Sequence, residues 1–241
     1  LQRIEQQWIH LHENLSRITT ATKGSASEQA RQPSTTSEAV DSNLIRVQTQ
    51  QLYQMEEELD HELRALQAKL QNVARSSIVR VYGEGPVQIA LELDFHGERS
   101  DLSRHTISIL LWYGTPHAAW TWLQQIQQGS WNGAAFELGK GYTINAETTA
   151  RGGGSINFVE KSQKSHEAWT VGLTEKEGRL GMFINLQDNT ETRKHDVCVG
   201  KVIDGFDALQ RLVDVSRQDD GPTVTIHQAT ATHLTRHQRL Q

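Results

Sequence analysis

The stretch GMFINLQDNTETRKHDVCVGKVIDGFDALQRLVDV, residues 181–215, decides how the fold is predicted. Its segments 181–186 and 196–202 are short, apolar and rich in β-branched or aromatic residues, which predicts two strands. Residues 206–215 have apolar positions at helical spacing and directly follow Gly205, which predicts a turn into a helix. The stretch therefore predicts a sheet whose late strands are followed by a covering helix.

Similar short strands, together with a second helix, are predicted over most of the chain from residue 77. A helix is predicted at 115–128, with Pro116 in its first turn and Gly129 just past its end. Many short strands with two separated helices predict a mainly β domain with α, a closed antiparallel β-barrel capped by two helices. The domain covers residues 77–235, before a tail at 236–241, and its other strands are predicted at 78–82, 87–95, 106–113, 133–137, 142–146, 169–173 and 222–232.

The first 76 residues have a helical pattern instead. Residues 1–18 carry apolar side chains four and three positions apart, which predicts an amphipathic helix. Residues 19–42 are rich in Ser, Thr, Ala and Gln, which predicts a flexible linker. Residues 43–76 repeat apolar side chains every seven positions, as in a coiled coil, which predicts a long heptad helix. The predicted partner-binding face consists of Leu52, Leu59, Leu63, Leu66, Leu70 and Val73.

Three partners remain open for this helical arm: its own residues 1–18 in a hairpin, a second copy, or another protein. We favour docking of 1–18 and 43–76 to another chain, because a long helix with a narrow apolar seam buries little against a compact domain.

Charge and composition argue against several classes of partner and structure. The net charge is −5, from 24 basic and 29 acidic residues, and no basic stripe is present, which argues against nucleic acid as the main partner. No run of about 18 apolar residues predicts a membrane-spanning helix in this stretch. Cys198, the only cysteine, excludes an intrachain disulfide and is expected to be buried.

The compartment stays undetermined. A chain that begins at Leu1 is compatible with a processed organellar or secretory-pathway lumenal protein, whose targeting or membrane segment was removed, and equally with a cytoplasmic one.

Six segments of the predicted barrel carry a resemblance to a known family. They are VQIALEL at 87–93, TPHAAWTWL at 115–123, GSWNGAAF at 129–136, GGG at 152–154, GMFI at 181–184 and VGKVIDGFDAL at 199–209. In this order and spacing, residues 78–233 resemble the cyclophilin family of peptidyl-prolyl cis-trans isomerases. The resemblance implies a cyclophilin-like barrel that acts on X–Pro bonds without any cofactor or metal.

The resemblance also implies a site, and most of its polar residues are replaced. Cyclophilins lower an amide rotation barrier of roughly 18–20 kcal/mol with an arginine, a glutamine and an apolar proline pocket. Leu138 stands at the position of the arginine, Asn145 near that of the glutamine, and Glu191 and Asp196 at those of a tryptophan and a histidine. A shift of one residue would place His195 there instead.

The apolar part of the implied site is better preserved. Phe136, Tyr142 and Phe183, with Asn145, are predicted to line a groove for proline-containing peptides. His166, His195 and His227 are isolated in sequence and are expected at the surface, so no metal site is predicted.

These observations predict a catalytically degenerate cyclophilin-like protein that serves as a structural or interaction subunit of a larger assembly. One alternative is a module that binds proline-containing peptides in the groove. The other is a weak isomerase in which an unaligned arginine, Arg151 or Arg179, takes over the catalytic role.

Overall fold

The structure is a computed structural model of the 241-residue chain, and it describes residues 37–96, 105–149, 156, 160–218 and 223–234. The predicted helix at 1–18, the tail at 236–241 and Arg151 lie outside the described residues. The chain divides into two compact units, Leu1–Lys69 and Leu70–Gln241, which are considered separately below.

Helix α2, Ser37–Tyr82, provides the described residues of the first unit and the beginning of the second. It includes the predicted heptad segment and is longer at both ends. Within the first unit, several large apolar side chains of this helix are exposed to solvent: Val47, Tyr53, Met55 and Leu66. Only Met55 and Leu66 among them lie on the same side of the helix, because they are eleven residues, or about three turns, apart.

The prediction of a strand at 78–82 was wrong, because these residues form the last turns of α2. Ala74 and Ile78, four positions apart on the helix, are both 2% exposed and bury one helical face. The Tyr82 hydroxyl accepts a hydrogen bond from Gln127 Nε2 at 3.1 Å. Packing of this face outweighs the weak local preference of Ile and Val for strands.

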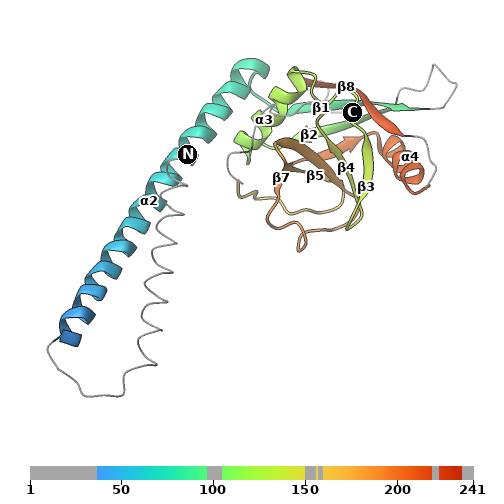
Figure 1. Cartoon of the computed structure of the whole chain (residues 1–241). Helices are drawn as coiled ribbons and strands as arrows, with labels where there is room; N and C mark the ends of the chain where they lie inside the picture. The colour runs from blue at the N-terminus through green and yellow to red at the C-terminus, as the bar shows by residue number, and fades with distance from the viewer. Residues whose placement is uncertain (1–36, 97–104, 150–155, 157–159, 219–222, 235–241) are drawn as a thin grey trace. The chain divides into compact units, whose positions relative to one another are not determined.

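An antiparallel, curled sheet of eight strands forms the second unit (Figure 1). The strand order is β3-β4-β6-β5-β7-β2-β1-β8, so neighbours in the sheet are often distant in sequence. Each strand overlaps one that the sequence predicts beyond residue 87, which confirms this part of the prediction. The strands are β1 Val87–Phe95, β2 His105–Leu111, β3 Phe136–Gly139, β4 Thr143–Glu147, β5 Thr170–Lys176, β6 Arg179–Asn185, β7 Val197–Asp204 and β8 Val224–His233.

The sheet is open, and the prediction of a closed barrel was wrong in this respect. Within the described residues, the end strands β3 and β8 share no ladder, and the isolated bridge between Ala135 and Thr225 connects their neighbourhood. Strand β3 is only four residues long, which limits the number of backbone groups available to complete the ring.

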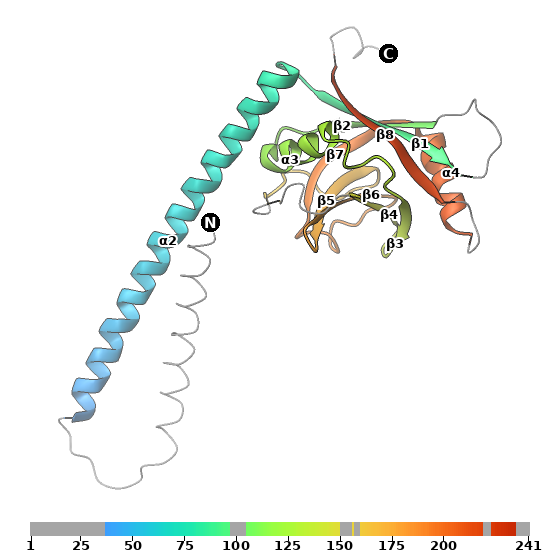
Figure 2. The ribbon, with the colours of Figure 1, turned by 45° about the horizontal axis from the view of Figure 1, so that its top comes forward.

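Helices α3, Pro116–Gln127, and α4, Phe206–Ser216, lie at opposite ends of the curled sheet in both views (Figures 1 and 2). Gly205 precedes α4 with a φ of +83°, and a Cβ there would lie 2.1 Å from the carbonyl oxygen of Thr106. Only glycine tolerates both the left-handed backbone and this close approach. The sequence prediction of a glycine turn into this helix is confirmed.

The core lies between the concave face of the sheet and the two helices. Trp122 of α3 and Trp131 beyond it are fully buried, with ring centroids 6.3 Å apart in an edge-on arrangement. Among the described residues, no helix combines the length and the apolar character needed to cross a membrane.

Candidate functional site

A row of four residues crosses strands β4, β6, β5 and β7 on the face of the sheet opposite the core. The strand register pairs Asn145 with Phe183, Phe183 with Gly172, and Gly172 with Cys198. Met182, a sequence neighbour of Phe183, belongs to the core cluster, and successive side chains of a strand point to opposite faces. The row therefore faces outward, at the position where the sequence places the proline-binding phenylalanine.

The Phe183 ring is covered by other side chains of the same chain. The guanidinium carbon of Arg193 lies 4.3 Å from its centroid, and the His166 ring lies 5.4 Å away at an interplanar angle of 31°. Phe183 is consequently only 2% exposed. Arg193 is held in place by Asp196, whose carboxylate oxygen lies 3.2 Å from its terminal nitrogen. This arrangement leaves the aromatic ring no free face for a ligand.

Gly172 provides the space that the Phe183 ring occupies. A Cβ at Gly172 would lie 2.1 Å from Cζ of Phe183, well inside van der Waals contact. The ring therefore packs against the bare backbone of β5, and any larger residue at position 172 would have to displace it.

A buried hydrogen-bond network supports this covering layer. Asn185 Nδ2 donates to Thr170 Oγ1 at 2.9 Å, and Asn189 Nδ2 donates to Asn185 Oδ1 at 2.9 Å. The two ring nitrogens of His166 contact Asn185 Nδ2 at 3.3 Å and the Asp196 carbonyl oxygen at 3.1 Å. The prediction of His166 as a surface residue was wrong, since it is 3% exposed and connects two loops.

Glu160 is a buried carboxylate at the start of α3. It accepts hydrogen bonds from the backbone N–H groups of His117 at 3.1 Å and Ala118 at 2.8 Å. Gln71 and Arg75 of α2 also act on this carboxyl, and burial outweighs all these favourable contacts and raises its pKa. The side chain thereby caps a helix whose own N-cap residue, Thr115, makes no capping hydrogen bond.

Cys198 ends the row as a buried thiol. It is fully buried, as the sequence predicts, and its Sγ lies 3.7 Å from the carbonyl oxygen of Ser165. Burial raises the pKa of this thiol to about 11. A protonated, inaccessible thiol does not act as a nucleophile near neutral pH.

The predicted peptide groove is only partly assembled. Phe183 and Asn145 are direct cross-strand neighbours, whereas Phe136 packs in the hydrophobic core. Tyr142 lies in the turn before β4 with a φ of +54° and is 56% exposed. The Asn145 Oδ1 atom is buried and has no hydrogen-bond partner among the described residues.

The structure also locates the residues that stand at the positions of the cyclophilin polar catalytic residues. Leu138 is a solvent-exposed residue of the end strand β3, opposite Ile144. Glu191 is exposed, and Asp196 forms the ion pair with Arg193. Arg179 opens strand β6 and makes no ion pair with any described residue.

Arg193, His166 and Glu160 are the important residues that sequence reasoning missed. Arg193 and His166 stand in loops whose sequence has no periodicity to indicate which strand they approach. A charged residue among polar neighbours gives no local signal that it packs on an aromatic ring. Only their burial and their contacts in the folded chain identify these residues.

The predicted partner-binding residues all lie on α2. Leu66 is 36% exposed and Val73, in the second unit, is 63% exposed. The spacing of the set places its members along one side of the helix.

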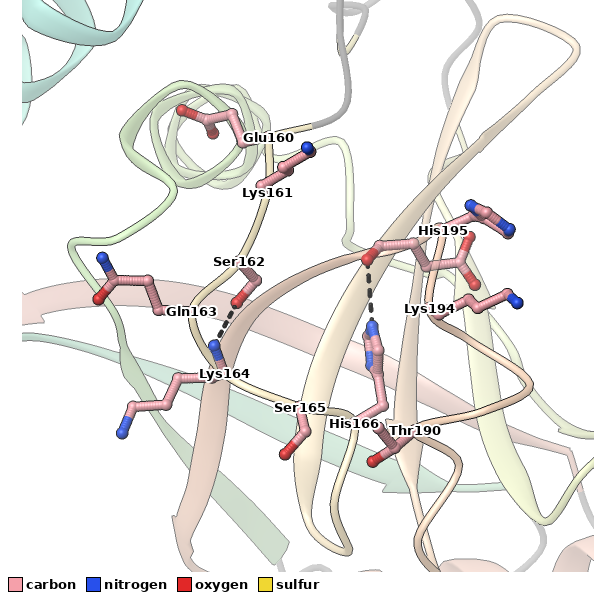
Figure 3. A pocket seen from close by; sticks show the side chains of 11 residues that line it. Glu160, Lys161, Ser162, Gln163, Lys164, Ser165, His166, Thr190, Lys194 and His195 are labelled. Atoms are coloured by element: carbon pink, nitrogen blue, oxygen red, sulfur yellow. Dashed lines mark hydrogen bonds between the residues drawn. The ribbon is translucent and has the colours of Figure 1, made fainter.

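A pocket of about 780 Å³ opens beside His166, whose ring also packs on Phe183; Figure 3 shows the side chains that line it. One wall is the segment 160–166, and the other is the loop that carries Thr190, Lys194, His195 and Asp196. The hydrogen bond from His166 to the Asp196 carbonyl joins the two walls (Figure 3).

Comparisons with protein families, curated proteins and solved structures gave different results. No protein-family model matches the chain, and no curated protein matches it. Among solved structures, a cyclophilin type peptidyl-prolyl cis-trans isomerase of Cryptosporidium parvum is similar to it at 14% identity and a TM-score of 0.48. The match covers 62% of this chain and 99% of that chain. A likeness at this level does not assign the chain to a family.

Proposed function

We propose that this chain is a non-catalytic, cyclophilin-like protein that works as an interaction subunit of a larger assembly. The observation that carries the proposal is the covered ring of Phe183, which is 2% exposed beneath Arg193 and His166. A proline ring needs an open apolar surface before its amide bond can be twisted. Here that surface is already occupied by side chains of the chain itself.

The residue at the position of the family's arginine supports the same proposal. Leu138 has no hydrogen-bond donor in its side chain, and its neighbour Glu137 brings a negative charge. Neither residue stabilises the nitrogen lone pair that develops when an X–Pro amide loses its conjugation. The thiol of Cys198 is buried with a raised pKa, so it offers no substitute chemistry.

The interaction role is carried by α2. Met55 and Leu66 are exposed apolar residues on one side of α2 in the described part of the first unit. A partner chain that covered them would remove this apolar area from water, at roughly 25 cal/mol for each Å².

An isomerisation assay on the full chain tests the absence of catalysis. We expect no acceleration of cis–trans exchange in a proline peptide by the parent chain, measured by NMR exchange. The Leu138→Arg variant should also stay inactive, because Phe183 remains covered, and Leu138→Gln serves as a control without a guanidinium. Exchange by the parent at the rate of a working cyclophilin would overturn the proposal.

Sedimentation of the full chain tests the interaction role. Leu66→Glu should weaken association with whatever chain covers α2, whereas Ala68→Glu changes the same charge on the opposite side of the helix. A parent chain that sediments as a monomer and retains no partner on purification from its source would contradict this role.

A second candidate is a module that binds proline-containing peptides without turning them over. The exposed side chain of Tyr142 favours it, because it offers an aromatic contact to a proline-containing peptide. Binding of a proline peptide that Tyr142→Ala and Phe183→Ala both weaken would support this candidate. No binding at millimolar peptide would remove it.

A further inference from the structure

The pocket beside His166 has two walls that the fold holds at a fixed separation (Figure 3). His166 Nε2 bonds to the Asp196 carbonyl at 3.1 Å, and the Asn189 N–H donates to the His166 carbonyl at 2.8 Å. Both His166 and Asn189 are at least 96% buried. Of these two residues, His166 lines the pocket, so buried hydrogen bonds hold one of its lining side chains in place.

The carboxylates that line the pocket are already engaged. Glu160 accepts the two backbone N–H groups at the start of α3, and Asp196 pairs with Arg193 at 3.2 Å. Their negative charges are therefore directed to groups of the chain itself and not into the cavity.

The cations of the pocket are not engaged in this way. Lys161, Lys164 and Lys194 line it, and within the described residues none of the three ammonium groups lies in an ion pair. The chain as a whole carries a charge of −5. The lining therefore has three lysines against two carboxylates, a formal excess of one positive charge on an acidic chain.

The three lysines differ in their orientation. Lys161 stands on one wall and Lys194 on the other, and Lys194 is an exposed side chain with a flexible stem (Figure 3). Lys164 is directed away from the centre of the pocket, and its ammonium lies 6.0 Å from the ring centroid of Trp112. The Ser162 hydroxyl oxygen accepts the Lys164 N–H at 3.0 Å, which leaves the hydroxyl proton available for an acceptor.

We propose that this pocket binds a ligand that carries a phosphate monoester, with Lys161 and Lys194 supplying charge from the two walls and Ser162 donating a hydrogen bond. A phosphate monoester carries a charge of about −1.5 to −2 and three acceptor oxygens. Two ammonium groups and one hydroxyl match that charge and those acceptors. The volume of about 780 Å³ leaves room for the organic part of the ester.

Calorimetric titration of the full chain at low ionic strength tests this site. The probes are O-phosphoserine, a short peptide containing phosphoserine, and inorganic phosphate, with serine as the reference that lacks the phosphate. We expect saturable binding of the phosphorylated probes and none of serine. Tighter binding of the peptide than of inorganic phosphate identifies a phosphorylated polypeptide as the source of the group, and the reverse order identifies a small phosphate.

Charge-matched variants separate a built site from general attraction. Lys161→Gln and Lys194→Gln should each weaken binding about fivefold, and Lys164→Gln and the remote Lys140→Gln should change it less than about twofold. Equal loss in Lys140→Gln and Lys161→Gln, or the absence of saturable binding by every probe, would overturn the proposal. The isomerisation assay with Leu138→Arg does not touch this pocket, so the two proposals fail independently.

Discussion

The guanidinium of Arg193 lies over the face of the Phe183 ring, with its carbon 4.3 Å from the ring centroid. The two residues are ten positions apart, and the intervening loop returns over the outer face of β6. This contact fills the position at which the sequence places a proline pocket. It is the contact on which the proposed lack of isomerase activity rests.

Replacing Arg193 tests that relationship directly. Arg193→Ala removes a cation–π contact and an ion pair, and we expect the free energy of unfolding to fall by about 0.5–2 kcal/mol. The change also uncovers the Phe183 ring, so binding of a proline peptide should increase. Urea denaturation followed by tryptophan fluorescence, together with an NMR titration, measures both effects.

Arg179→Ala is the matched control for this prediction. Arg179 forms no ion pair with any described residue, so its loss should alter stability by less than about 0.5 kcal/mol. Equal effects of the two substitutions would mean that the contact between Arg193 and Phe183 does not stabilise the fold.

Gly172→Ala should destabilise the chain by about 1–3 kcal/mol, because the added methyl group meets the Phe183 ring at 2.1 Å. Gly114→Ala is the control, since nothing lies within 4 Å of a Cβ there. Denaturant midpoints of the two variants decide the matter. A Gly172→Ala protein as stable as the parent would show that the ring is free to move away from β5.

The raised pKa of Glu160 makes the stability of the fold depend on pH. Its pKa is raised above the ordinary value by burial, so the folded state binds the proton more tightly than the unfolded state does. The stability that Glu160 contributes is therefore greatest below the unfolded pKa and falls as pH rises through the raised pKa. The unfolding free energy of the parent minus that of Glu160→Gln should be larger at about pH 4 than at about pH 7.

At the lower pH, Glu160→Gln should cost about 1–3 kcal/mol, because one N–H at the start of α3 loses its acceptor. Glu177→Gln, an exposed change in the turn between β5 and β6, controls for the altered charge. A difference that grows with rising pH would contradict the assigned sign.

The thiol of Cys198 should be unreactive in the native chain. Its pKa of about 11 and its complete burial leave little accessible thiolate at about pH 8. A chromogenic disulfide reagent should therefore label no thiol in the native chain and one after unfolding in urea. The Cys198→Ser/Ser76→Cys variant, with an exposed thiol on α2, should react in the native state, whereas rapid native labelling of the parent would contradict the prediction.

Local sequence predicted most elements because their causes are local. The strands are short apolar or alternating segments, α3 begins with a proline, and α4 follows Gly205, whose left-handed backbone favours glycine. Residues 78–82 were mistaken for a strand because their β-branched side chains are the same in either element. The contact of Ala74 and Ile78 with the core decides for a helix, and no local pattern reports that contact.

The sequence predicted some features of the candidate site and missed others. The sequence placed Asn145 and Phe183 on predicted strands and Leu138 directly after one, because the polarity pattern of each strand is local. It did not indicate that Phe136 turns into the core or that His166 is buried. Both depend on which segments, distant in sequence, lie on each face of the sheet.

The sequence by itself determined most of the element types, the absence of a donor at Leu138 and the apolar character of the heptad segment. These properties depend on side-chain chemistry and on repeats of two or seven residues, both of which are visible in a short stretch of sequence. Only the tertiary structure decided that the sheet is open, that Glu160 caps α3 from more than 40 residues away, and that Arg193 covers Phe183. Those outcomes depend on contacts between distant segments, whose energies no local window contains.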